Sequence, residues 1–364
     1  MSAKQLQRIL ITAGGTGGHV FPALAVAQAF RAQGVDVRWI GTRQGIEARV
    51  VPAADIAIDY LDVAGVRGQG IKRLLLAPVK IARGVLQVMS IVRRYRPDAV
   101  LGMGGFVTGP TGVAAWLSGI PLFIHEQNAI AGFTNRMLSR LARRVFQAFP
   151  SAFPASVKVE TTGNPVRADI AALVEPAQRY AEHTGPLRFL ILGGSQGAVS
   201  LNQQIPQALA QLQGKLDFVV RHQAGPKNLE AAQTFYRDAG VQADVLPFIE
   251  DMASAYGWAD LVICRSGALT VSELAAAGVA ALLIPYPHAV DDHQTRNGEY
   301  LSQHGAAVLV QQQNMTPASL AQLILNSFSD RAQLQAMAGK ARSLAMQDAT
   351  GKVVRACKEV VSGT

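Results

Sequence analysis

The chain has 364 residues, of which 49% are hydrophobic and 16% charged, and its formal net charge is +9. This length exceeds one ordinary hydrophobic core and fits two domains, while the high apolar content excludes an intrinsically disordered chain. The basic balance favours an anionic partner, such as a nucleotide, a pyrophosphate, a nucleic acid or an acidic membrane surface.

Cysteine usage and the N-terminus bear on where the protein acts. The two cysteines, Cys264 and Cys357, have no metal-ligand spacing, which favours a reducing compartment without a disulfide framework. Residues 1–7 are polar and lead into an apolar run with no signal-peptide pattern, so we expect a cytoplasmic protein. Residues 99–124 carry no charge, but their glycines and prolines divide them into shorter elements, and we reject a membrane-spanning helix there.

Strand and helix patterns alternate in the first half of the chain. Arg8–Thr12 predicts a strand, a glycine loop follows, and Pro22–Gln33 predicts a helix that leads to a strand at Asp36–Ile40. Further strands are expected at Ala99–Leu101 and Leu122–His125, each followed by a glycine-rich or polar loop. Ligands collect at such strand ends in α/β proteins.

The same pattern begins again after the turn-forming triplet Gly163-Asn164-Pro165. A strand at Arg188–Leu192 runs into a glycine loop and a helical segment, which repeats the order seen in residues 8–33. The C-terminal stretch Thr316–Val361 is helical by pattern. The remaining strands of this half are expected at Asp217–Arg221, Ala243–Leu246, Leu261–Cys264 and Ala280–Ile284. The sequence therefore predicts an α/β protein with two doubly wound parallel sheets.

The first glycine loop, residues 14–18, follows a strand and opens a helix, where free backbone amides bind anions. It does not match a dinucleotide fingerprint, because Val20 stands where the third glycine belongs and no acid ends the second strand. An NADP enzyme that uses Arg43 stays open as an alternative. His19 lies at the mouth of this helix, where a neutral imidazole could remove a proton from a hydroxyl or could only cap and pack.

A second anion site is predicted where the strand Leu261–Cys264 meets a helix. Ser266 and Thr270 can present helix-start amides and hydroxyls to a phosphate, and Glu273 can accept two hydrogen bonds from a ribose diol. The alternative makes Ser266 an N-cap and Glu273 a solvated acid of the first turns. The chain has no Asp-x-Asp pair, so we expect no carboxylate clamp for a divalent metal.

Residues 71–83 mix aliphatic side chains with lysine and arginine at near-helical spacing. Such a surface suits an anionic bilayer interface, and an ordinary amphipathic helix that faces the core is the alternative. A nucleic-acid partner is less favoured, because no basic and aromatic interleaving or known binding module occurs.

Six motifs, in this order, resemble the MurG family of bacterial peptidoglycan N-acetylglucosaminyltransferases, which convert lipid I to lipid II. The resemblance spans essentially the whole chain. Each motif alone is weak, but six at suitable separations are specific. They are Gly14–Ala27, Gly102–Pro110, His125–Gly132, Gly163–Arg167, Gly193–Ala198 and Arg265–Gly278. One departure is Phe106, where this family often carries tyrosine.

The resemblance implies a GT-B fold with two Rossmann-like domains facing across a cleft. It divides the chain into an acceptor and membrane domain at residues 1–163, a domain for UDP-GlcNAc at 164–340, and a C-terminal helix at 341–364 that packs back on the first domain. Ile249 would read uracil through its backbone, Ser195 would touch phosphate and Glu273 would hold the ribose. The full implied donor site is Thr16, Gly17, Gly18, Asn128, Arg167, Ser195, Ile249, Ala268, Leu269, Thr270, Val271, Ser272, Glu273 and Gln294.

The resemblance also implies an inverting reaction without an essential bound metal or other cofactor, in which His19 is the general base for the acceptor's 4-hydroxyl. The acceptor pyrophosphate would lie on Gly14, Gly15, Gly104 and Gly105. A docking surface on the cytoplasmic face of the inner membrane would use Ile71, Lys72, Leu75, Val79 and Lys80. Cell-wall and division proteins are implied as partners, and nucleic acid is not. A UDP-GlcNAc epimerase and a non-catalytic donor-binding subunit are the alternative functions.

Overall fold

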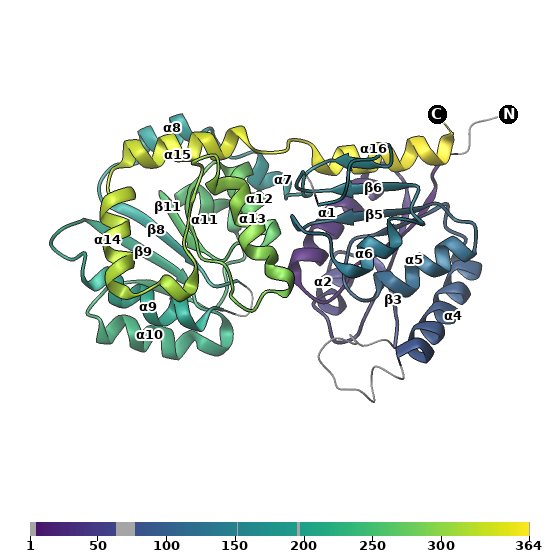
Figure 1. Ribbon diagram of the computed structural model, residues 1–364, viewed down its shortest axis with the longest axis horizontal. Coiled ribbons are helices and arrows are strands. Elements are labelled where there is room, and N and C mark those ends of the chain that lie inside the picture. The colour runs from purple at the N-terminus through teal and green to yellow at the C-terminus, as the bar shows by residue number, and fades with distance from the viewer. Residues whose placement is uncertain (1–4, 63–76, 151, 195–196, 364) are drawn as a thin grey trace. The chain divides into compact units, whose positions relative to one another are not determined.

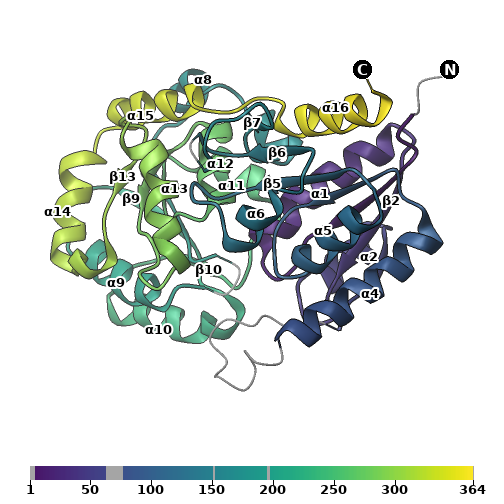
Figure 2. The ribbon, with the colours of Figure 1, turned by 45° about the vertical axis from the view of Figure 1, so that its right-hand side comes forward.

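The computed structural model describes residues 5–62, 77–150, 152–194 and 197–363. The chain forms two compact units, Met1–Val166 with Asp348–Thr364, and Arg167–Gln347. Each unit is built on one parallel sheet (Figures 1 and 2). The predicted α/β class with two doubly wound sheets is confirmed.

Unit 1 contains a parallel sheet of seven strands in the order β3-β2-β1-β4-β5-β6-β7. Ile9 and Ile11 of β1 face one core cluster and Leu10 faces the other, and all three are fully buried. Alternate residues of this strand therefore enter cores on both faces, which is why it reads as a continuous apolar run. The strands are β1 Arg8–Thr12, β2 Asp36–Gly41, β3 Ala57–Tyr60, β4 Ala99–Gly102, β5 Leu122–Glu126, β6 Arg144–Gln147 and β7 Val159–Thr161.

Helices cover both faces of this sheet (Figure 2). They are α1 Gly17–Ala32, α2 Glu47–Ala53, α4 Ala77–Tyr95, α5 Thr108–Leu117, α6 Phe133–Leu138 and α16 Ala349–Ser362. α16 lies against α1, and its Val353, Val354 and Cys357 join the same core cluster as Val20 and Phe30 of α1 (Figure 1). The last helix of the chain therefore completes the core of the unit that contains the first.

Unit 2 contains a parallel sheet of six strands in the order β10-β9-β8-β11-β12-β13. The strands are β8 Leu187–Leu192, β9 Phe218–Gln223, β10 Asp244–Leu246, β11 Leu261–Cys264, β12 Ala280–Leu283 and β13 Val308–Leu309. The helices are α7 Ala168–Ala171, α8 Pro176–Glu182, α9 Val199–Ala210, α10 Leu229–Asp238, α11 Met252–Trp258, α12 Ala268–Ala277, α13 His293–Ser302, α14 Pro317–Ser327 and α15 Arg331–Ser343. Single 3₁₀ turns span Pro226–Asn228, Val290–Asp292 and Gln312–Asn314.

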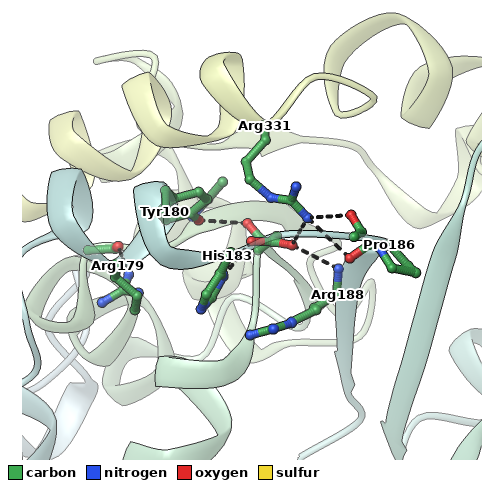
Figure 3. Close-up of polar contacts among 10 residues, drawn as sticks. Arg179, Tyr180, His183, Pro186, Arg188 and Arg331 are labelled. Atoms are coloured by element: carbon green, nitrogen blue, oxygen red, sulfur yellow. Dashed lines mark hydrogen bonds and ion pairs between the residues drawn. The ribbon is translucent and has the colours of Figure 1, made fainter.

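A buried carboxylate ties the entry of this second sheet to two helices (Figure 3). Asp260, which is fully buried just before β11, accepts hydrogen bonds from the Arg188 amide at 3.0 Å and from Arg331 Nη2 at 3.1 Å. Its other carboxylate oxygen lies 2.7 Å from His183 Nδ1, and its carbonyl accepts from the Tyr180 hydroxyl at 2.6 Å. These partners satisfy a charge that would otherwise be costly to bury.

Several element boundaries differ from the sequence prediction. α1 begins at Gly17 rather than Pro22, so the proline lies within the helix and His19 lies in its first turn. The strands β3, β6, β7 and β13 were not predicted. The expected boundary at residues 340 and 341 falls inside α15, and the chain enters unit 1 at Asp348. In the described parts of the chain, no helix is both long and apolar enough to cross a membrane.

Candidate functional site

In each sheet, the strand order reverses between the first strand and its later neighbour, and these reversals position the candidate sites. The reversal lies between β1 and β4 in unit 1 and between β8 and β11 in unit 2. The loops that leave two such strands diverge to opposite faces of the sheet, which opens a crevice at their carboxyl ends. The predicted glycine loops follow β1, β4 and β8, and the predicted phosphate site follows β11.

At the end of β1, Thr16 precedes α1 with an extended backbone and no side-chain capping bond. The amides of Gly17 and Gly18 open the helix, where N–H groups have no acceptor within the helix. The predicted anion site therefore has the geometry of a helix start. His19 follows directly, and its Nδ1 lies 2.9 Å from Oε1 of Gln127 at the end of β5.

The glycines after β4 let this loop approach the first one. Gly104 has a φ of +99°, and a Cβ there would lie 2.4 Å from His19 Nδ1. Gly105 has a φ of +82°, and a Cβ there would lie 2.4 Å from the carbonyl oxygen of Gly14. Residues with side chains are excluded at both positions by backbone strain and by contact. The structure thus brings the predicted residues Gly14, Gly104 and Gly105 together beside His19.

Glu47 is a site residue that the sequence analysis missed. Its fully buried carboxylate accepts hydrogen bonds from the Gly15 amide at 3.1 Å, the Thr42 amide at 2.9 Å and the Thr42 hydroxyl at 2.7 Å. The sequence analysis looked for an acid at the end of the second strand, whereas Glu47 comes six residues after Gly41, at the start of α2. The Gly15 amide, expected to face a pyrophosphate, therefore holds the loop to this carboxylate.

The end of β5 contributes four consecutive polar residues. His125 is fully buried, and its Nε2 lies 3.0 Å from the carbonyl oxygen of Gly163. Burial lowers the pKa of His125 to about 4. Glu126 accepts from both the backbone amide and the side-chain amide of Asn128, and it also holds Asn135 of α6 at 2.8 Å. Asn128, a predicted donor contact, is therefore positioned by a neighbouring carboxylate.

In unit 2, Gln223 joins two loops of the predicted donor site. Its Nε2 donates to the Gly194 carbonyl at 3.1 Å, and its Oε1 accepts from the Ile249 amide at 2.9 Å. The Ile249 N–H is thus engaged with Gln223, so the predicted backbone contact with uracil would fall to the Ile249 carbonyl. Ser195, the predicted phosphate contact, lies outside the described residues.

The predicted helix after β11 is α12, which begins after Gly267 and carries six of the predicted donor residues. Ala268, Leu269 and Thr270 form its first turn, while the Ser272 hydroxyl donates to the Ala268 carbonyl at 3.0 Å. Val271 is fully buried and its N–H donates to the Gly267 carbonyl at 2.9 Å, so this residue offers a ligand neither its side chain nor its amide.

Glu273, expected to hold a ribose, is buried on the next turn of α12. Its Oε2 accepts a 3.0 Å hydrogen bond from the hydroxyl of Tyr256 on α11. Burial raises the pKa of Glu273 to about 7, against the lowering effects of the Arg167 charge and the Tyr256 hydrogen bond. Arg167 and Glu273, predicted as separate donor contacts, therefore interact electrostatically. Tyr256 was missed, because it lies 17 residues away in a segment without any motif.

Gln294, also predicted to contact the donor, lies in the first turn of α13. Its Oε1 accepts from the Tyr286 amide at 2.9 Å, so the side chain pins the loop that follows β12. Arg167 precedes α7, and the other predicted donor residues of unit 2 that the structure describes lie in a loop or the first turns of a helix at the carboxyl edge of the sheet.

The predicted docking segment continues into α4. Ile71, Lys72 and Leu75 lie outside the described residues. Val79 and Lys80 are exposed, as are the neighbouring Ile81 and Arg83. From Val85 onward, α4 buries one face in the core. Residues 78–83 therefore lie outside this core, and the core-facing part of α4 begins after the predicted segment.

The adjoining helix α5 adds apolar surface that the sequence analysis did not identify. Trp116 and Leu117, at the end of α5, are more than half exposed. α4 and α5 lie side by side (Figure 2). Phe106, which departs from the family pattern, is 38% exposed in the loop after β4.

Comparisons with known proteins cover nearly the whole chain. Residues 9–147 match the glycosyltransferase family 28 N-terminal domain, and residues 188–353 match its C-terminal domain. The chain is 54% identical over 363 residues to the UDP-N-acetylglucosamine–N-acetylmuramyl-(pentapeptide) pyrophosphoryl-undecaprenol N-acetylglucosamine transferase of Marinobacter nauticus, with 100% of both chains covered. It is 52% identical to the transferase of the same name from Pseudomonas paraeruginosa, with 98% and 99% covered.

Solved structures agree with this relationship. The crystal structure of Acinetobacter baumannii MurG matches with a TM-score of 0.83 and 47% identity, covering 96% of this chain and 99% of that one. A UDP-N-acetylglucosamine 2-epimerase from Neisseria meningitidis matches with a TM-score of 0.66 at 15% identity, over 97% and 99% of the two chains, which shows a shared fold alone. The chain has the GT-B glycosyltransferase fold and belongs to glycosyltransferase family 28 and, within it, to the MurG family.

Proposed function

We propose that the protein transfers N-acetylglucosamine from UDP-GlcNAc to the C4 hydroxyl of the MurNAc unit of lipid I, undecaprenyl-pyrophosphoryl-MurNAc-pentapeptide. The product is lipid II for peptidoglycan synthesis. The observation that carries this proposal is the full-length identity of 54% to a relative named for this reaction. The arrangement of His19 beside three glycine-rich loop residues supports it, because a base next to an anion site suits a phosphorylated acceptor.

The reaction inverts the anomeric centre. His19 takes the proton of the acceptor hydroxyl, and the hydroxyl oxygen attacks the anomeric carbon from the face opposite the UDP leaving group. The α-linked donor then gives a β-1,4 linkage. Backbone amides at the start of α12 and the charge of Arg167 offset the negative charge that develops on UDP. The proposed transfer needs no bound metal.

The donor-binding residues divide by the part of UDP-GlcNAc that they contact. Glu273 accepts from the ribose hydroxyls, the first turn of α12 and Ser195 bind the diphosphate, and the Ile249 carbonyl reads uracil. We assign this contact to the carbonyl because the Ile249 amide already donates to Gln223. The remaining donor contacts in the proposal are Thr16, Gly17, Gly18, Asn128, Arg167 and Gln294.

The acceptor pyrophosphate binds at the loops after β1 and β4, where Gly14, Gly104 and Gly105 pack closely beside His19. The Gly15 amide donates to the Glu47 carboxylate, so in this proposal it shapes the loop and does not face the phosphate. In this proposal the acceptor's charged group lies next to the base.

The protein docks on the anionic cytoplasmic face of the inner membrane through the exposed start of α4 and the end of α5. Exposed apolar area comes from Val79, Ile81, Trp116 and Leu117. Lys80 lies between Val79 and Ile81 in the sequence. Aliphatic and aromatic side chains beside cations fit the interface of an anionic bilayer. Cell-wall and division proteins are further proposed partners.

The test is release of UDP from UDP-GlcNAc, measured with and without a short-chain lipid I analogue in excess EDTA. The proposal predicts release only when the acceptor is present, unaffected by EDTA. Release without acceptor would instead indicate hydrolysis or epimerisation. UDP binding without any release would indicate a donor-binding subunit.

A further inference from the structure

Gln127 connects three parts of unit 1 through its side chain. It follows β5 and is 1% exposed, and its Oε1 lies 2.9 Å from Nδ1 of His19 in α1. Its Nε2 lies 2.9 Å from the carbonyl oxygen of Met103, which follows β4. Both ends of the amide are thus engaged, away from bulk water.

These two contacts fix the orientation of the amide. The Met103 carbonyl can only accept a hydrogen bond, so the atom of Gln127 that faces it must be the NH₂ group. The other end, which faces His19, must then be the oxygen. Because an amide oxygen can only accept, the hydrogen in the His19 contact must belong to Nδ1. A neutral His19 ring therefore carries its proton on Nδ1 and keeps a free lone pair on Nε2.

The surrounding backbone holds the members of this chain of contacts in place. The His19 ring packs against the Cα of Gly104, where a Cβ would lie within 2.4 Å of Nδ1. The Met103 amide donates to the Thr12 carbonyl at 2.8 Å. The Gln127 carbonyl accepts from Asn164 Nδ2 at 3.1 Å. Ring and amide are accordingly constrained from separate segments of the unit.

We propose that Gln127 is a positioning residue, which selects the His19 tautomer whose Nε2 accepts the proton of the acceptor hydroxyl. This inference rests on the proposed transferase function. In the step, the Nε2 lone pair takes the hydroxyl proton while the hydroxyl oxygen forms its bond to the anomeric carbon. The bond from that carbon to the phosphate oxygen breaks, and UDP leaves with the electron pair. Throughout the step, His19 Nδ1 keeps its proton and its hydrogen bond to Gln127 Oε1. The amide dipole of Gln127 stabilises the imidazolium that forms.

The tautomer is measured directly, without any activity, by NMR of ¹⁵N-histidine-labelled protein at mildly alkaline pH. The chain has seven histidines, and the His19→Ala variant assigns the His19 signals. The inference predicts a protonated Nδ1 and an unprotonated Nε2 in the wild type. In Gln127→Met, which removes the acceptor, the preference for Nδ1–H should be lost. Protonation at Nε2 in the wild type would overturn the inference.

Kinetics then separate positioning from a merely structural role. Gln127→Met should lower kcat about 10 to 100-fold while the KM for UDP-GlcNAc changes less than about twofold, since a wrong tautomer impairs proton transfer and not donor binding. Gln127→Glu keeps an acceptor facing Nδ1 and should retain clearly more activity than Gln127→Met. Full kcat in Gln127→Met would overturn the inference.

Gln147 provides a matched control in the same sheet. It is 6% exposed at the end of β6, where its Oε1 accepts from the Phe153 amide and its Nε2 donates to Thr161. Gln147→Met loses the same number of buried hydrogen bonds but leaves His19 untouched, so its kcat should stay near that of the wild type. An equal loss of kcat in both variants would overturn the specific role of Gln127. The two proposals can fail separately. If NMR shows Nδ1–H in the wild type but UDP release does not depend on the acceptor, the proposed function is overturned and the tautomer assignment stands.

Discussion

The hydroxyl of Tyr256 donates a 3.0 Å hydrogen bond to Oε2 of Glu273, and both side chains are buried. Tyr256 lies on α11 and Glu273 on α12, so the contact fixes the carboxylate relative to the neighbouring helix. A carboxylate that is already oriented loses less side-chain entropy when it receives the two hydroxyls of a ribose. We therefore expect Tyr256 to contribute to donor affinity without touching the donor.

Tyr256→Phe should raise the KM for UDP-GlcNAc about 2 to 10-fold, with kcat nearly unchanged, because one hydrogen bond to the carboxylate is lost. Steady-state kinetics at fixed acceptor concentration measure this. Tyr236→Phe is the control, since Tyr236 is equally buried in unit 2 but pairs with His222. If both variants changed the KM alike, the orienting role of Tyr256 would be excluded.

Donor affinity should depend on pH through Glu273. Burial raises the pKa of Glu273 to about 7, so its carboxyl is ionised above that pH and increasingly protonated below it. The ionised form accepts both ribose hydroxyls, so the Kd for UDP-GlcNAc should rise up to about tenfold between pH 8 and pH 6. Calorimetric titration of wild type and Glu273→Gln measures this. Glu273→Gln should bind UDP-GlcNAc weakly, with a Kd that does not change with pH. If the Kd of both proteins changed with pH in the same way, Glu273 would not be the group that controls donor affinity.

Glu47→Ala should loosen the glycine loop after β1. The substitution leaves the Gly15 amide, the Thr42 amide and the Thr42 hydroxyl without their acceptor, at a cost of about 3 kcal/mol. We expect faster hydrogen exchange at residues 13–18 and a higher KM for the lipid acceptor, with the donor KM little changed. Asp55→Asn, at a 97% exposed side chain, is the control and should alter none of these. Unchanged exchange in Glu47→Ala would show that the loop holds its shape without this anchor.

Membrane binding should be sensitive to the exposed start of α4. Val79→Asp combined with Ile81→Asp should weaken binding to anionic phospholipid vesicles at least about tenfold, because each change removes apolar area from the interface and adds a negative charge. Vesicle co-sedimentation measures the effect. Val157→Asp is the control, since Val157 is 94% exposed and precedes β7. Equal losses in both proteins would point to a general charge effect.

The sequence was sufficient for the fold class, for the strands that carry the glycine loops and for the place of His19. Those features depend on local patterns, namely apolar runs that end in glycines and the start of a helix. Glu47, Gln223 and Tyr256 could not be identified in this way. Each acts through a side chain that reaches another segment, 17 to 32 residues away. The start of α1 was misplaced because proline is favoured in a first turn, whereas the helix begins within the glycine loop.

The function of individual predicted residues also changed once their partners were known. Gly15 was expected to face a pyrophosphate and the Ile249 backbone to read uracil, yet the amide of each residue donates to a buried side chain of the protein. A backbone group near a site either holds a loop in place or faces a ligand, and only the three-dimensional arrangement distinguishes the two roles.

Inverting transfer to a specific hydroxyl is the central claim, and the structure of the product tests it most directly. The product made from UDP-GlcNAc and a short-chain lipid I analogue is isolated, and its glycosidic linkage is assigned by NMR. We predict a β linkage from N-acetylglucosamine to the C4 oxygen of MurNAc. An α linkage, attachment at another hydroxyl, or release of an unattached sugar would contradict it.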